Sequence, residues 1–221
     1  MRLRRKPWAR PELAACPFFV DDPQQMRGNW RNLFARPTQP VHMELGCGKG
    51  GFLAQLASGQ PNINYLGLDI KSEVLVLAKR KVEAAYARAE LPVDNVFLMS
   101  HDIERLHLIF TPEEKVARIY INFCNPWPKE SYHKHRLTHT RQLDQYRKYL
   151  KPGGQLWFKT DDDPLFEDTL GYLQDAKWDV KYITRDLHQS GFEHNVVTEH
   201  EAMFSQMGIP IKFVIAAPMW Q

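Results

Sequence analysis

The chain has 221 residues, of which 43% are hydrophobic and 25% are charged, and its formal net charge is +3. This composition is typical of a globular protein with one core and excludes an intrinsically disordered chain. No apolar run approaches the roughly 20 residues that cross a bilayer. The 3 cysteines are irregularly spaced, which predicts neither a disulfide framework nor a zinc site. We therefore expect a cytoplasmic protein with no membrane segment and no metal ion.

The predicted elements alternate between strands and helices along most of the chain. Residues 1–25 contain four prolines and a basic start, and we expect a flexible N-terminal arm there, followed by a single domain over 26–221. We expect strands at 41–45, 63–70, 95–100, 118–123, 154–160, 179–186 and 211–217, and helices at 50–58, 72–90, 137–150 and from Asp163, its N-cap. This alternation predicts an α/β, Rossmann-like fold: a seven-stranded, mostly parallel sheet with helices on both faces.

A glycine-rich loop follows the first predicted strand. Gly46 and Gly48 allow a tight turn that lets a ligand approach the backbone, and the next helix offers free amides. We expect both glycines to bind a nucleotide-like cofactor at the carboxyl edge of the sheet. Gly46, Gly48 and Gly51 also match the dinucleotide pattern G-x-G-x-x-G, so the spacing alone leaves an NAD-dependent enzyme open.

Acidic residues near the ends of three successive predicted strands narrow the choice of ligand. Glu44 stands just before the first glycine, where a carboxylate would repel a diphosphate but suit a cationic ligand. S-adenosylmethionine carries a sulfonium and an ammonium and no phosphate. We expect Asp69 to accept hydrogen bonds from its ribose hydroxyls and Asp102 to accept one from its adenine amine. The alternative is that each acid merely caps a helix.

The fourth predicted strand leads into a loop rich in proline and aromatic residues, NFCNPWPK, at 122–129. Two prolines around a tryptophan predict an extended, rigid loop. Asn125 offers one acceptor and two donors, and Trp127 offers either a stacking face for a base or ordinary packing. Positive charge is concentrated over 1–10 and 129–151, which favours a nucleic-acid partner or, alternatively, a solvated helix face.

Four segments that run in order over most of the chain form a characteristic set. They are MELGCGKGGFLAQLA, NYLGLDIKSEVLVLAKRKV, NFCNPWPKESYHKHRLTHTRQLDQYRKYLKPGGQLWFKTDD and VVTEHEAMFSQMGIPI. This set resembles the bacterial tRNA (guanine-N7)-methyltransferases. The resemblance implies a class I methyltransferase fold, S-adenosylmethionine as methyl donor, and a guanine in the variable loop of tRNA as acceptor. It also implies that no second protein subunit is needed, so we expect a monomer or a homodimer.

The resemblance also implies roles for individual residues. Cofactor contacts are implied for Glu44, Asp69, Asp102 and Asn125, and tRNA contacts for Lys129, Asp161, Thr198 and Glu201. Many family members have Asp at the position of Asn125. Guanine N7 already carries an in-plane lone pair and needs no general base, so we interpret Asn125 as a positioning residue. We hypothesise that Asp161 or Glu201 supplies the carboxylate that faces guanine N1 and N2.

Two other interpretations remain open at this point. A methyltransferase of the same fold could act on another RNA or on a small-molecule base. A catalytically silent RNA-binding protein could keep the fold, and Asn125 in place of Asp is the feature that supports this alternative. Methyl transfer to tRNA distinguishes these possibilities, whereas cofactor binding alone does not.

Overall fold

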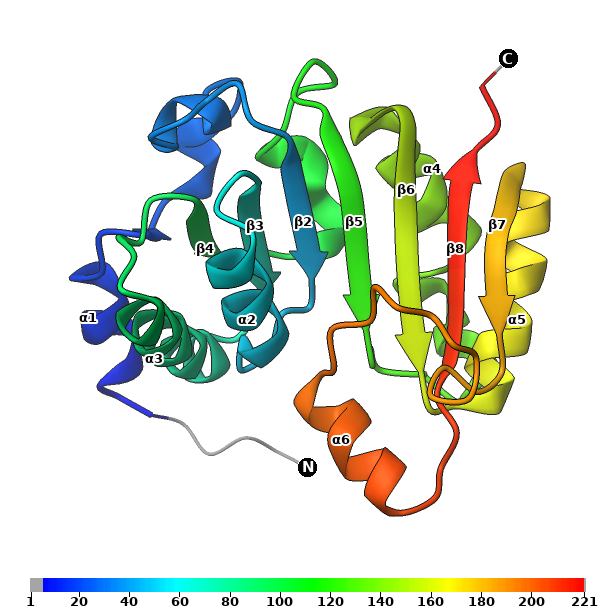
Figure 1. The fold of residues 1–221 in the computed structure, drawn as a ribbon. Helices are drawn as coiled ribbons and strands as arrows, with labels where there is room; N and C mark the ends of the chain where they lie inside the picture. Colours follow the sequence, from blue (N-terminus) through cyan, green and yellow to red (C-terminus); the bar gives the residue numbers. More distant parts are fainter. Residues whose placement is uncertain (1–5, 221) are drawn as a thin grey trace. The chain divides into compact units, whose positions relative to one another are not determined.

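A computed structural model of the chain describes residues 6–220. Contacts between residues divide the chain into two compact units, Met1–Glu114 and Lys115–Gln221. Within the described residues, each unit holds four strands with helices packed on them (Figure 1). None of the helices in this part of the chain is long and apolar enough to cross a membrane.

The first unit contains four parallel strands in the order β1-β4-β3-β2. They are β1 (Phe19–Val20), β2 (Val41–Leu45), β3 (Asn64–Asp69) and β4 (Val96–Ser100). All of β2 is buried, which is typical of a parallel strand covered on both faces. Glu44 is paired in register with Gly67, and Asp69 is paired with Ser100. The carboxyl ends of β2, β3 and β4 therefore meet at one edge.

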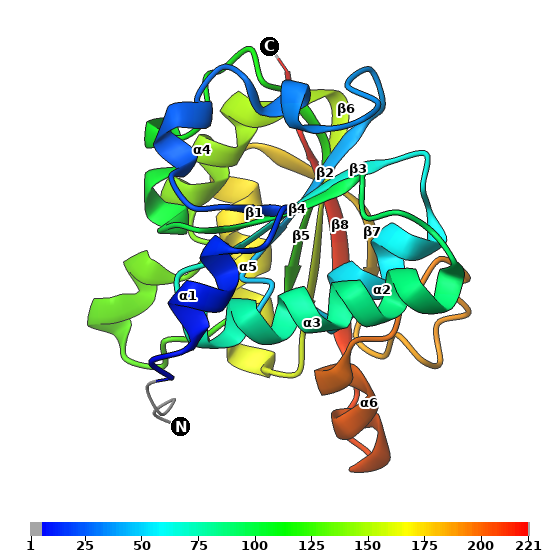
Figure 2. The ribbon, with the colours of Figure 1, turned by 90° about the vertical axis from the view of Figure 1, so that its left-hand side faces the viewer.

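The helices of the first unit pack on these strands and on one another. They are α1 (Ala9–Ala14), α2 (Gly51–Gly59) and α3 (Ser72–Ala89), with the 3₁₀ helices η1 (Pro23–Met26), η2 (Trp30–Leu33) and η3 (Ile103–Leu108). Val74, Ala78, Val82 and Ala85 recur every three or four residues on α3 and are buried, as an amphipathic helix requires. Helix α2 packs beside α3, and α1 packs against α3 (Figure 2).

Residues 1–5 of the predicted N-terminal arm lie outside the described residues, and residues 6–25 are more ordered than the sequence predicted. Helix α1 and strand β1 lie within residues 1–25; Leu13 is fully buried, and Phe19 is paired with Leu98 of β4. Pro11 lies in the first turn of α1, where a missing N–H costs no helical hydrogen bond. Strand β1 also raises the strand count from the predicted seven to eight among the described residues. It was missed because two residues are too few to show an alternating pattern.

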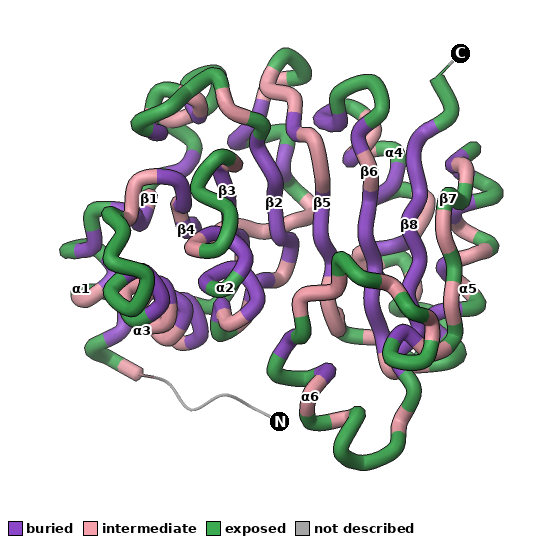
Figure 3. Tube along the Cα trace, in the orientation of Figure 1, coloured by how far each residue is buried: buried purple, intermediate pink, exposed green. Residues whose placement is uncertain are grey.

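The second unit contains four strands in the order β5-β6-β8-β7. They are β5 (Val116–Asn122), β6 (Leu150–Thr160), β7 (Trp178–Thr184) and β8 (Lys212–Pro218). Strands β5 and β6 are parallel, whereas β8 is antiparallel to both β6 and β7. Every residue of β8 is buried, and Figure 3 shows this strand as a continuous buried segment between two partners. The predicted mostly parallel sheet is therefore confirmed, with one antiparallel strand.

The second unit has three α-helices and one 3₁₀ helix among its described residues. They are α4 (Thr140–Tyr149), α5 (Asp163–Asp175), α6 (Glu199–Gln206) and η4 (Glu130–His135). Helix α4 begins at Thr140 rather than at residue 137 because the His139 side chain caps it, accepting from the Arg141 N–H at 3.3 Å. The N-cap of α5 is Asp162 and not Asp163, because Asp162 accepts from the Leu165 N–H at 2.7 Å.

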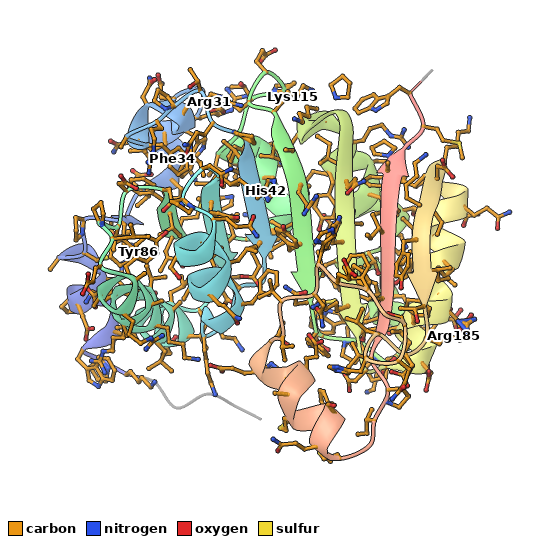
Figure 4. The ribbon with its side chains drawn as sticks, viewed as in Figure 1. Arg31, Phe34, His42, Tyr86, Lys115 and Arg185 are labelled. Carbon is orange, nitrogen blue, oxygen red and sulfur yellow. The ribbon has the colours of Figure 1, made fainter. Side chains whose placement is uncertain are left out.

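A buried polar network fixes α3 within the first unit. The Tyr86 hydroxyl, labelled in Figure 4, donates to the Asn95 side-chain oxygen. The Asn95 amide in turn donates to the Ile63 carbonyl at 2.8 Å. Helix α3 is thereby joined to the turns that precede β3 and β4. Because Ala78 of this helix lies against Gly50, the network also supports the glycine-rich loop.

Candidate cofactor and substrate sites

The loop after β2 takes a conformation that favours glycine at three positions. Gly46, Gly48 and Gly50 have φ angles of 78°, 51° and 70°. The N–H groups of Gly46 and Cys47 both donate to the Leu68 carbonyl, at 2.8 and 2.9 Å. These two hydrogen bonds hold the loop against the end of β3.

Asp69 joins the end of β3 to this loop. One carboxylate oxygen accepts from the Gly48 N–H at 3.0 Å, and the other accepts from the Lys71 N–H at 2.9 Å. Burial raises the pKa of the Asp69 carboxyl, and the hydrogen bonds from Lys71 and Gly48 oppose that rise. Each carboxylate oxygen can accept more than one hydrogen bond, so Asp69 can also accept from a diol.

Glu44 lies beside the same loop and is only 3% exposed. Cys47 is buried beside the Glu44 and Asp69 carboxylates. Burial raises the pKa of its thiol most, and the negative charges of these two carboxylates raise it further. The structure therefore brings Glu44 and Asp69 together around Cys47, as the sequence predicted for an acidic site. Burial and the two neighbouring carboxylates therefore favour the neutral thiol of Cys47 over the thiolate that a nucleophile needs.

Asp102 has a structural role at the end of β4. One of its carboxylate oxygens accepts from the Glu104 N–H at 3.0 Å and caps η3. The other lies 3.7 Å from Arg105 Nε, and 42% of the side chain is exposed. This is the capping role that the sequence analysis gave as the alternative. A second role toward adenine remains a prediction.

Sequence reasoning missed Ile70 at this edge. Ile70 follows Asp69 directly and is 62% exposed. A large apolar side chain that stands in solvent next to Asp69 in the chain offers a flat-ring ligand an apolar face. The signal that could have revealed it is the end of β3 at Asp69, which places Ile70 beyond the buried strand.

In the second unit, the loop after β5 is held in a strained form by Asn125. Phe123 and Trp127 have φ angles of 52° and 44°, which non-glycine residues rarely adopt. The Asn125 side-chain oxygen accepts from the Trp127 N–H at 3.0 Å. Asn125 is itself exposed, and its side-chain oxygen stabilises the turn.

Arg136 holds the loop after β5 by a hydrogen bond and is not part of an exposed basic surface. It is only 2% exposed. Its Nε donates to the Pro126 carbonyl at 2.7 Å, and its guanidinium pairs with Asp168 and donates to the Tyr172 hydroxyl. The sequence analysis counted Arg136 among the charges that favour a nucleic acid. That assignment is wrong, because burial and pairing with α5 use this charge within the fold.

Two of the residues predicted to contact substrate are accessible in the second unit. Lys129 is exposed at the start of η4. Asp161 follows β6 and is half-buried, and its backbone carbonyl accepts from Lys212 Nζ at 3.0 Å. Lys212 also lies 2.7 Å from an Asp163 carboxylate oxygen. Within residues 6–220, the Asp161 carboxylate forms no hydrogen bond or ion pair.

Thr198 and Glu201 form the capping box of α6. The Thr198 hydroxyl accepts from the Glu201 N–H at 3.0 Å, and the Glu201 carboxylate accepts from the Thr198 N–H at 3.2 Å. Glu201 is fully buried and lies 3.0 Å from Lys159 Nζ on β6. Its second oxygen accepts from the Asn195 side chain at 2.5 Å. These contacts attach α6 to the second unit.

Solved structures of similar fold are methyltransferases. An antibiotic-related methyltransferase matches with a TM-score of 0.61 at 17% identity, over 92% of this chain and 98% of that one. The 16S rRNA methyltransferase KamB matches with a TM-score of 0.56 at 16% identity, over 85% of this chain and 90% of that one. At these identities the likeness shows the fold alone, and that fold is the Rossmann-like α/β fold of class I methyltransferases.

Sequence relatives narrow this class further. A family model described as "Putative methyltransferase" matches residues 38–214. The tRNA (guanine-N(7)-)-methyltransferase of Clostridium perfringens strain 13 is 58% identical over 98% of this chain and 99% of its own length. That of Ruminiclostridium cellulolyticum is 57% identical over 98% of this chain and 92% of its own length. The chain belongs to the tRNA (guanine-N(7)-)-methyltransferase family.

Proposed function

We propose that this methyltransferase moves a methyl group from S-adenosylmethionine to N7 of a guanine in the variable loop of tRNA. The observation that carries the proposal is the glycine loop of the first unit, with the buried Glu44 and the half-buried Asp69 beside it. Relatives that are named for this methyl transfer match the chain over nearly their whole length. A tRNA substrate implies a cytoplasmic location, which is part of the proposal.

The residues of the loop suit S-adenosylmethionine better than a dinucleotide. Three glycines with positive φ let a ligand approach the backbone closely. Two carboxylates next to them oppose a diphosphate and favour a cation. We assign Glu44 to the ammonium group, Asp69 to the ribose hydroxyls, and Asp102 and Ile70 to the adenine. When bound, this cofactor supplies an electrophilic methyl group on a positively charged sulfur.

The acceptor chemistry requires positioning and not proton removal. Guanine N7 carries an in-plane lone pair, and the purine becomes positively charged when a methyl group is added. The protein must therefore align N7 and tolerate that charge. Asn125 is suited to alignment, because its exposed amide is held by the turn it forms with Trp127. It supplies no negative charge.

Of the two candidate carboxylates for guanine N1 and N2, we favour Asp161. The Glu201 carboxylate is fully buried and shared among Lys159, Asn195 and the Thr198 N–H. Asp161 is half-buried, and its carboxylate has no partner among the described residues. A carboxylate without an internal partner can accept from N1 and N2 at a low cost of rearrangement.

The function is tested with purified protein, unmodified tRNA and S-adenosylmethionine labelled on its methyl group. We expect label in 7-methylguanosine after digestion of the tRNA to nucleosides, with no added protein subunit. Label in another nucleoside would keep the class and overturn the substrate. If the cofactor binds and no label is transferred, the protein is a silent RNA-binding member of the fold.

Replacing Asp161 tests the assignment of the guanine contact. We expect Asp161→Ala to lower kcat/KM for tRNA by about 10-fold or more, because two donors on the base lose a charged acceptor. The affinity for S-adenosylmethionine should stay unchanged. Asp163→Ala is the matched control, since Asp163 is an exposed neighbour that pairs with Lys212. Full tRNA activity of Asp161→Ala would contradict the assignment.

A further inference from the structure

Three aromatic rings gather at the surface of the second unit, next to Asn125. Trp127 lies 5.8 Å from Tyr132 and 5.6 Å from His135, and Tyr132 lies 6.3 Å from His135, all between ring centroids. We call these three residues the aromatic cluster. Tyr132 is 46% exposed, which is unusual for a ring that already has two aromatic neighbours.

The backbone around the aromatic cluster holds the rings in place before any ligand binds. The Tyr132 N–H donates to the Lys129 carbonyl at 2.8 Å within η4. Trp127 is fixed by the turn that Asn125 forms. The buried Arg136 donates to the carbonyl of Pro126, the residue before Trp127. A surface that is ordered in advance loses little conformational entropy on binding.

The charge around the aromatic cluster suits a nucleic acid. Lys129 and Lys134 are exposed at the start and near the end of the same short helix. Glu130 is the one acid over residues 129–136. Exposed aromatic rings flanked by cations are the combination with which proteins bind single-stranded nucleic acids, where rings stack on bases and cations contact phosphates.

The spacing of the rings shows how a base would bind. The rings are 5.6 to 6.3 Å apart and tilted by 42° to 52°. A base held between two rings needs about 7 Å, twice the contact distance of stacked carbon atoms. No base therefore fits inside the aromatic cluster. A base can stack on it from the solvent side, where Tyr132 is the most exposed of the three rings. A guanine aligned by Asn125 then lies beside the aromatic cluster and not inside it.

We propose that Tyr132 stacks on a nucleobase that flanks the methylated guanine and so positions the tRNA. The inference rests on the proposed function. Trp127 is two residues from Asn125, a span of at most about 7 Å. A nucleotide held at Asn125 therefore has its neighbour within reach of the aromatic cluster. Stacking on every kind of base is tolerated, so this contact adds affinity and orientation without reading the sequence.

Substitution of Tyr132 separates stacking from packing. We expect Tyr132→Leu to raise the Kd for unmodified tRNA by about five-fold or more, and Tyr132→Phe to stay within about two-fold of the unsubstituted protein. The Kd is measured by filter binding without cofactor, so it does not depend on turnover. Melting temperatures should be equal, because the ring is half exposed. A Tyr132→Leu protein that binds tRNA normally would overturn the inference.

A charge variant on the same helix is the matched control. Stacking is not ionic, so Tyr132→Leu should leave the slope of log Kd against log salt unchanged. Lys134→Gln should reduce that slope by about 0.7 to 0.9, the value of one phosphate contact. If Tyr132→Leu changes the slope as Lys134→Gln does, its effect comes from displaced charges and the stacking role is wrong.

A tRNA lacking one base at a time identifies the partner of Tyr132. Abasic nucleotides are placed singly at the positions that flank the target guanine. At one position we expect the missing base to raise the Kd of the unsubstituted protein about five-fold and to have no further effect on Tyr132→Leu. If the loss of affinity from the missing base and the loss from Tyr132→Leu add at every position, the inference is overturned. A protein that binds tRNA but transfers no methyl group would contradict the proposed function and leave this binding test decisive.

Discussion

At the scale of single residues, Gly50 is a position where the first unit leaves no room for a side chain. A Cβ built on it would lie 2.5 Å from the Cβ of Ala78 and 2.7 Å from its Cα, and its φ is 70°. The obstacle is helix backbone, which cannot move aside as the end of a long side chain can. The sequence analysis assigned ligand roles to Gly46 and Gly48 and passed over Gly50, because its constraint comes from a helix later in the chain.

We expect Gly50→Ala to lower the free energy of unfolding by about 1 to 3 kcal/mol and to weaken cofactor binding. Urea unfolding and calorimetric titration with S-adenosylmethionine measure the two effects. The control is Gly59→Ala at the end of α2, where nothing lies within 4 Å of the added Cβ. It should be neutral or slightly stabilising, since alanine favours a helix. Equal effects of the two substitutions would show that the contact with Ala78 is unimportant.

Asp69 predicts how cofactor binding depends on pH. Burial raises its pKa above the ordinary value of 3.8, and only the charged form is a full acceptor for two hydroxyls. Affinity for S-adenosylmethionine should therefore fall as the pH drops through this raised pKa. The free energy of unfolding depends on pH in the opposite direction. Because the folded protein binds this proton more tightly than the unfolded chain does, the proton stabilises the fold at low pH, and this stabilisation is lost as the pH rises through the folded-state pKa.

Titrations between about pH 4 and about pH 7 measure this dependence, with Asp69→Asn as the comparison. We expect the asparagine variant to bind more weakly at neutral pH and to lose the part of the profile that the Asp69 carboxyl contributes. Identical profiles for the two proteins would assign the titration to another group.

At the scale of elements, the buried pair of Glu201 and Lys159 determines how α6 is attached. Both side chains are almost wholly buried, and the pair joins the first turn of α6 to β6. Breaking such a pair leaves a charge without its partner in a place that water does not reach. The T-x-x-E pattern at Thr198 and Glu201 is therefore sufficiently explained by capping and attachment of the helix.

We expect Glu201→Gln to lower the free energy of unfolding by about 3 kcal/mol, because Lys159 stays charged and buried. Glutamine can still accept the capping hydrogen bond, so the loss of stability reports the missing charge alone. Thermal unfolding measures it, and the double variant Glu201→Gln with Lys159→Met should recover part of the loss. If Glu201→Gln is fully stable but binds tRNA poorly, Glu201 contacts substrate as the family resemblance implies.

At the scale of the whole molecule, the exposed charges limit how strongly salt acts on tRNA binding. Seven basic residues lie over 129–151. Arg136 pairs with Asp168, and Arg147 donates to the Met219 carbonyl at 2.7 Å, so both serve the fold. The exposed remainder is Lys129, Lys134, Arg141, Lys148 and Lys151.

We expect these five residues together to contribute at most about 3.5 to 4.5 to the magnitude of the slope of log Kd against log salt. Replacing Lys148 and Lys151 with Gln should lower it by up to about 1.8. Arg185, labelled in Figure 4, is the control: it is exposed, pairs with Glu167 at 2.8 Å and lies outside this segment. A slope that is equally sensitive to Arg185→Gln would place the tRNA on a different surface.

Much of the fold could be predicted from patterns that depend only on neighbours in the chain. The strand at 41–45 has the predicted bounds, and the helix predicted at 72–90 differs by one residue, because apolar periodicity and turn residues are local signals. The meeting of Glu44 and Asp69 followed from the same logic, since parallel strands end at one edge. The family was also predicted, from motifs that are continuous in the sequence.

Only the tertiary structure decided which of the polar residues are used by the fold itself. Arg136 bonds to Asp168, 32 residues away, and Glu201 bonds to Lys159, 42 residues away. In the sequence each looks like an exposed charge available to a substrate. Burial and pairing are properties of residues that meet after the chain has folded, so no local pattern distinguishes these two from Lys129 or Asp161.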